Sequence, residues 1–121
     1  MPKMKKKIPE ILKKGFIVYK DADAKKAIAV WSEGSSQHGT YELEEKLKSL
    51  RQVEAAHGKY LSYKVKEIQE ITPTAQLIFI TLSYERSNLS ARFMAYKQGQ
   101  KWIIANFLFD VFVQTTKSFL L

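Results

Sequence analysis

The sequence contains no cysteine and only two histidines, His38 and His57. Without cysteine the chain can form no disulfide, no thiolate nucleophile and no Cys-based metal site. The two histidines lie 19 positions apart and match no zinc-binding spacing. The glycine-rich loops that bind nucleotides and the serine elbow of hydrolases are missing as well. These absences leave no standard catalytic signature, and we expect no metal and no cofactor.

Long apolar runs are also missing, and no segment approaches the roughly 18 consecutive apolar residues of a membrane-spanning helix. The lysine-rich start is similar to the beginning of an export signal. However, Pro9, Glu10, Lys13 and Lys14 interrupt the apolar stretch that would have to follow. We expect a cytoplasmic protein if this N-terminus is native, and an exported one if a leader has been removed.

Positive charge is concentrated near the N-terminus. Residues 1–26 carry nine lysines and three acidic residues, a balance of +6, whereas residues 27–121 carry eleven basic and nine acidic residues, a balance of +2. A nucleic-acid-binding domain normally spreads its basic residues over a folded face. We therefore expect residues 1–7 to form a flexible Lys-rich tail and residues 8–121 a single domain, with nucleic acid not the partner.

The first half of the chain has helical periodicity. One helix is predicted to begin near Pro9, a second to be capped by Asp23, and a third to be capped by Thr40 and to end at Gly58. Gly15 lies inside the first helix and should weaken it slightly. Each helix has an apolar stripe at three- and four-residue spacing: Ile8, Leu12, Phe16 and Tyr19; Ala24, Ala27, Ile28 and Trp31; Leu43, Leu47, Leu50 and Val53.

After Gly58 the apolar period changes to two, which is typical of strands. Leu61, Tyr63 and Val65 alternate with polar residues, and further strands are predicted at residues 75–85, 89–97 and 101–113. Helices followed by an antiparallel meander indicate an α+β fold. In this fold the N-terminal helices pack on one face of a curved, cone-like sheet of about four strands.

The order and character of four parts of the chain carry a family resemblance. They are the segment "DADAKKAIAVW", the helix "YELEEKLKSLRQVEAAHG", the strands "KYLSYKVKEI", "LIFITLSYE" and "LSARFMAYK", and the turn and strand "KQGQKWIIANFLFD". Over roughly residues 8–112 this layout resembles the nuclear transport factor two-like superfamily, also called the cystatin-like or ketosteroid-isomerase-like cone, and above all its small bacterial members. The resemblance implies a conical sheet wrapped by helices, a cavity at its open end and frequent dimerisation through the sheet.

The candidate site residues lie mostly in the predicted strands. Alternation in the last strand would place Asn106 and Asp110 on one face with Trp102, Ile104 and Leu108. A carboxylate among apolar neighbours can act as a general base, so Asp110 is a candidate catalytic residue. The competing interpretation is a solvent-exposed Asp110, or one paired with Arg92. Six residues are candidates for ligand binding: Trp31, Tyr63, Phe93, Trp102, Asn106 and Asp110.

These observations favour a non-enzymatic domain that binds a small apolar or amphipathic ligand, or a protein partner, in or on its curved sheet. Two alternatives remain open. One is an isomerase, cyclase or dehydratase with Asp110 as general base, for which the sequence nominates no second catalytic group. The other is a protein that binds polyanions or membrane surfaces through its Lys-rich N-terminus.

Apolar residues on both faces of two strands bear on the oligomeric state. The strands at residues 75–85 and 101–113 are apolar on both faces over most of their length. The helices of so small a domain can cover only one face well. A second copy is the commonest cover for the other, so the sequence predicts a homodimer through the exposed sheet face.

Overall fold

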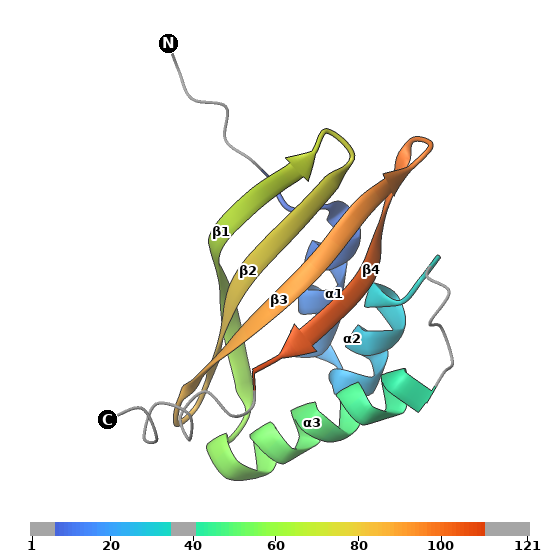
Figure 1. The fold of residues 1–121 in the computed structure, drawn as a ribbon. Coiled ribbons are helices and arrows are strands. Elements are labelled where there is room, and N and C mark those ends of the chain that lie inside the picture. The colour runs from blue at the N-terminus through green and yellow to red at the C-terminus, as the bar shows by residue number, and fades with distance from the viewer. Residues whose placement is uncertain (1–6, 35–40, 111–121) are drawn as a thin grey trace.

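The computed structural model describes residues 7–34 and 41–110. Three helices precede a four-stranded antiparallel sheet in which sequence neighbours are spatial neighbours, in the order β1-β2-β3-β4. In Figure 1, α1 and α2 lie behind the sheet, and α3 crosses its lower end. The predicted α+β fold, with helices on one face of a curved sheet, is confirmed. The elements are α1 (Glu10–Asp21), α2 (Ala24–Trp31), α3 (Tyr41–His57), β1 (Tyr60–Thr72), β2 (Ala75–Tyr84), β3 (Asn88–Gln98) and β4 (Lys101–Phe109).

Local sequence signals set most of the helix ends. Pro9 precedes α1, and the Asp23 side chain caps α2 by accepting a hydrogen bond of 2.9 Å from the Lys26 amide. Gly58 ends α3 with a φ of +93°, a conformation that favours glycine, and its amide donates to the Glu54 carbonyl at 2.8 Å. The predicted helix start near Pro9, the cap at Asp23 and the helix end at Gly58 are confirmed. Thr40, His38 and most of the Lys-rich segment 1–7 lie outside the described residues.

Trp31 lies at the centre of the core, between the helices and the sheet. It is fully buried, and its indole N–H donates to the Leu12 carbonyl at 3.1 Å, so its one polar group is satisfied. Aromatic rings surround it at centroid distances of 5.1 to 5.7 Å, from Phe16 on α1, Phe93 on β3 and Phe107 on β4. The apolar stripes of α1 and α2 therefore meet one continuous aromatic face of the sheet.

Gly15 allows the close packing of α1 on this tryptophan. A Cβ atom at position 15 would overlap the indole ring of Trp31. The sequence predicts only that Gly15 weakens α1 slightly. The structure shows that the missing side chain is what lets the two helices approach.

A bulge in β4 changes which of its side chains face the helices. Met94 pairs with Asn106 but the next residue of β3, Ala95, pairs with Ile104, so Ala105 is left over. Trp102 and Ile104 consequently share the helix-covered face with Phe107 and Phe109, while Asn106 and Leu108 point to the opposite side. The predicted single face containing Trp102, Ile104, Asn106 and Leu108 is therefore wrong. Strict alternation fails because one residue is inserted into the ladder.

Strand β1 is more irregular than its sequence pattern indicates. Its pairing with β2 shifts three times, between Tyr60 and Ser62, between Val65 and Glu67, and between Glu70 and Thr72. Tyr63 and Val65 pack against the core as predicted, but Leu61 falls at the first shift and is 43% exposed. The shifts bend β1, as Figure 1 shows.

The sheet face opposite the helices is called the open face here. Its apolar residues include Met94 and Tyr96 on β3 and Leu108 on β4, which are 36%, 36% and 48% exposed. Polar and charged side chains, among them Arg92 and Asn106, lie between them. In the part of the chain that the structure describes, no helix is long and apolar enough to cross a membrane.

Candidate functional site

Two of the residues predicted to bind ligand belong to the core. Trp31 and Phe93 are both fully buried, with their rings 5.1 Å apart. Phe93 also stacks on Phe107, with a centroid distance of 5.5 Å. Neither Trp31 nor Phe93 lines any of the four surface grooves described below. Their part in the fold is to fill the space that a conical sheet would otherwise enclose.

Tyr63 lies at the edge of this core. Its ring stacks on Phe16 of α1 with centroids 4.1 Å apart and an angle of 15° between the planes. Together with Ile17 and Leu61 it lines a shallow groove of about 290 Å³ along the flank of α1.

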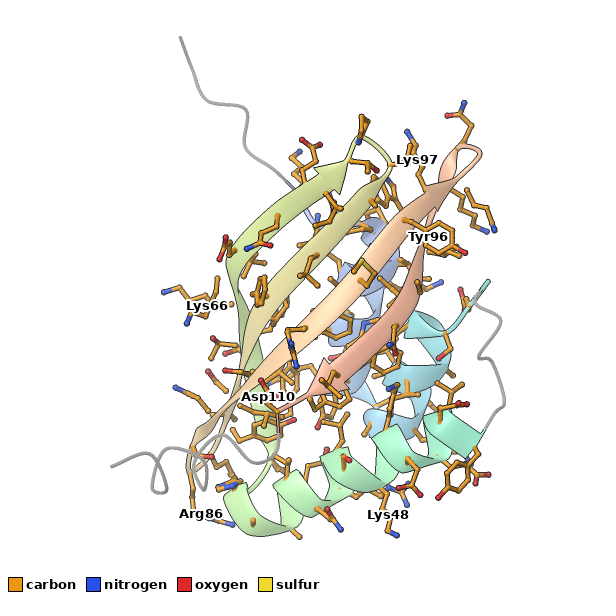
Figure 2. The ribbon with its side chains drawn as sticks, in the orientation of Figure 1. Lys48, Lys66, Arg86, Tyr96, Lys97 and Asp110 are labelled. Atoms are coloured by element: carbon orange, nitrogen blue, oxygen red, sulfur yellow. The ribbon has the colours of Figure 1, made fainter. Side chains whose placement is uncertain are left out.

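Asp110 follows the last residue of β4, on the outer side of the molecule (Figure 2). Its carboxylate lies 3.8 Å from the guanidinium of Arg92, and the two side chains are 40% and 44% exposed. They share a groove of about 400 Å³ with Lys66, Glu67 and Phe79. A partly solvated ion pair is the competing interpretation of Asp110 given above, and such a pair contributes little to stability.

Asn106 makes a local contact. Its side-chain oxygen accepts a hydrogen bond of 2.9 Å from the amide of Phe107, and the residue is exposed. The bulge at Ala105 places it on the open face, across the sheet from Trp102. The structure therefore does not bring Asn106 and Trp102 into one site.

Trp102 lines a groove between α1 and the β3–β4 hairpin, called the α1–β4 groove here. This groove has a volume of about 960 Å³ and lies at the end of the molecule where α1 begins. Trp102 is partly buried, and Ile11 and Ile17 of α1 face the same space. Three lysines and two glutamates complete its charged rim: Lys13, Lys14, Lys101, Glu10 and Glu33.

A buried network of tyrosines lies at the other end of α1 from the α1–β4 groove, and the sequence does not predict it. The Tyr19 hydroxyl lies 2.5 Å from a carboxylate oxygen of Glu54 and 2.9 Å from the Tyr84 hydroxyl. Tyr60 stacks on Tyr19 with centroids 4.2 Å apart and nearly parallel planes. Burial is the main reason why the pKa values of Tyr19, Tyr60 and Tyr84 are raised far above their usual range. The three hydroxyls therefore stay protonated in the folded protein.

Tyr19, Tyr60 and Glu54 line a polar groove of about 760 Å³, called the tyrosine pocket here. It lies where α1 and α3 end and where β1 begins. Sequence periodicity places Tyr19 on a core stripe, but it cannot show that Glu54, 35 positions away, turns toward it. Among the described residues, no three His, Asp or Glu side chains come together as metal ligands.

In the part of the chain that the structure describes, the protein is a small α+β domain with an aromatic core between its helices and its sheet, and the candidate sites described above lie at its periphery. No family model, curated protein or solved structure matches the chain. The architecture is compatible with a cone-like fold.

Proposed function

We propose that the protein is a non-enzymatic binding domain whose ligand is a small amphipathic anion, held in the α1–β4 groove. One observation carries the proposal: a partly buried tryptophan lines a groove that is apolar along one wall and rich in lysine at its rim. Ligand sites are typically apolar hollows of several hundred Å³ with a few polar groups that orient the ligand.

The wall and the rim suit different parts of such a ligand. Trp102, Ile11 and Ile17 offer apolar surface to a hydrocarbon chain. Lys13 is 3.5 Å from Glu10 and is partly neutralised by it. Lys14 and Lys101 are exposed at the rim, where their ammonium groups can meet an anionic head.

Fluorescence can test this assignment directly, because the two tryptophans differ in exposure. Trp31 is fully buried, so a ligand in the groove should change the emission of Trp102 alone. We expect octyl sulfate, below its micellar concentration, to produce a saturable change. Octylammonium and octanol should bind at least about tenfold more weakly, which corresponds to about 1.4 kcal/mol or more.

Charge variants separate the groove from the rest of the surface. Changing Lys14 and Lys101 together to Gln should weaken octyl sulfate binding about tenfold. Lys48→Gln is the control for the loss of a surface charge. It removes one positive charge on α3, far from the groove (Figure 2), and should leave octyl sulfate binding unchanged. Equal binding of all three octyl compounds, or no saturable change with any of them, would refute the proposal.

We also propose that a second copy of the chain covers the open face. The supporting observation is that apolar side chains of β3 and β4, namely Met94, Tyr96 and Leu108, are exposed together on one face. Burying such a patch against its own symmetry mate is the commonest solution for a small protein.

A further inference from the structure

The tyrosine pocket is distinct from the α1–β4 groove, and its walls carry a different chemistry. Two helices end at this pocket, α1 at Asp21 and α3 at His57, and α3 continues through Gly58 into β1. Helix C-termini carry partial negative charge on their free carbonyls. The backbone at the two helix ends therefore favours a cation in this pocket.

Glu54 adds a full negative charge inside the pocket. Of the charged residues that line it, Glu54 is the one that is not exposed to solvent, while Lys20, Lys59, Glu85 and the others lie at the rim. Long lysine side chains at a rim can turn outward into water, whereas a half-buried carboxylate cannot move away. The charge that a ligand meets inside is consequently that of Glu54.

The hydrogen bonds fix the direction in which this carboxylate is held. The Tyr19 hydroxyl has one proton, which it donates to a carboxylate oxygen of Glu54 at 2.5 Å. Tyr84 must then donate its own proton to the Tyr19 oxygen, at 2.9 Å. Tyr19 thus holds one oxygen of Glu54, and Tyr84 fixes the Tyr19 hydroxyl in that orientation. Among the described residues no donor occupies the other oxygen of Glu54.

Two further contacts complete the pocket. The Tyr60 ring, stacked on Tyr19, forms an aromatic wall beside Glu54. Arg86, in the β2–β3 turn near the end of α3 (Figure 2), is held by that helix: its amide donates to the His57 carbonyl at 2.8 Å and its guanidinium lies 3.5 Å from the Ala56 carbonyl. Arg86 is thus directed to the helix end and does not neutralise Glu54.

We propose that the tyrosine pocket binds a small organic cation, of the primary-amine or guanidinium type, with its charged group on the free oxygen of Glu54 and its carbon chain along the Tyr60 ring. An ammonium or guanidinium group supplies the N–H donors that this oxygen lacks, and an aromatic face attracts a cation. A metal ion fits less well, because Ca²⁺ or Mg²⁺ requires several oxygen ligands and the pocket interior offers one carboxylate.

The first test compares three probes on the unaltered protein: n-butylammonium, n-butanol and butyrate, each titrated against the backbone amide resonances of residues 54–61. We expect saturable shifts with butylammonium and none with butanol or butyrate. Because this comparison needs no variant, it does not depend on whether a mutant folds. Saturable binding of butyrate at the rim lysines, or no saturation with butylammonium, would overturn the proposal.

The second test uses two glutamates of the same pocket. Glu54→Gln keeps an oxygen that accepts from Tyr19 but removes the charge, so butylammonium should bind about tenfold more weakly or not at all. Glu85→Gln is the matched control, because Glu85 is exposed and its carboxylate accepts from the Lys59 amide at 3.0 Å. Its affinity should stay within about twofold of wild type. An unchanged affinity in Glu54→Gln would show that the cation binds elsewhere.

Discussion

An alanine at position 15 would have two opposite effects on stability, because Gly15 lies against Trp31. Replacing glycine by alanine inside a helix normally gains about 1 kcal/mol. Here the new methyl group would overlap the indole ring, which is also fixed by its hydrogen bond to Leu12. Overpacking of this kind typically costs about 1–3 kcal/mol, so the steric effect should win.

We therefore predict that Gly15→Ala lowers the free energy of unfolding, measured by urea denaturation, by up to about 2 kcal/mol, the steric cost less the gain in helix propensity. Lys14→Ala is the control, since Lys14 is exposed on the same helix and its replacement should change stability by less than about 0.5 kcal/mol. A stabilised Gly15→Ala protein would mean that α1 and α2 are not in close contact.

The buried tyrosines make stability depend on pH in the alkaline range. In the unfolded chain Tyr19, Tyr60 and Tyr84 ionise near pH 10.0, whereas burial raises their pKa values in the folded protein. Above pH 10 the unfolded state loses protons that the folded state keeps. Stability contributed by these groups is thus complete below pH 10 and is lost as the pH rises beyond it.

We predict that the urea concentration at the midpoint of unfolding falls as the pH is raised past 10. Tyr84→Phe should make the fall shallower, because one of the three ionisations is removed. Tyr96→Phe removes an exposed hydroxyl on the open face and should keep the wild-type slope. Identical slopes in all three proteins would indicate that the tyrosine network is open to solvent.

Among the elements, β4 gives the sharpest structural prediction, because one bulge decides where its side chains point. The chain contains no cysteine, so a single introduced thiol can be labelled without background. In the Met94→Lys background, which should be monomeric and leave the open face uncovered, we expect Asn106→Cys and Leu108→Cys to react rapidly with a thiol reagent. Ile104→Cys, at a position that is 1% exposed in the parent, should react at least about tenfold more slowly. Similar rates at 104 and 106 would show that strict alternation holds and that the bulge is absent.

The elements also show what the sequence could and could not predict. Asp23 and Gly58 mark helix ends through interactions within a few residues, so their roles can be read locally. The bulge at Ala105 depends on how β4 pairs with β3, which no spacing within β4 reveals. The candidate sites likewise depend on residues far apart in the chain. The sequence predicts Trp102 as a binding residue, but it shows neither the groove that Trp102 forms with α1 nor the contact between Tyr19 and Glu54.

For the whole molecule, the central prediction is the homodimer through the open face. Leu108→Lys and Met94→Lys place charges on exposed positions of that face, so each should fold normally and give monomers by light scattering. Phe107 and Phe109 are only 3% and 6% exposed and point toward the helices, so lysine at either position would unfold the protein and reveal nothing about assembly. A wild-type protein that is monomeric at micromolar concentration would contradict the dimer.

The irregular pairing of β1 has a consequence beyond the shape of the sheet. Among residues 7–34 and 41–110 the sheet does not close, so β1 is an edge strand of the described sheet, and its outer backbone groups could template a strand from another molecule. Its three shifts in register break the regular spacing that such a strand would need, and Lys64 and Lys66 add exposed charge along the same edge. Cross-β growth from this edge would have to flatten all three shifts and bury those charges, so the bends in β1 also act as a barrier to amyloid-type aggregation.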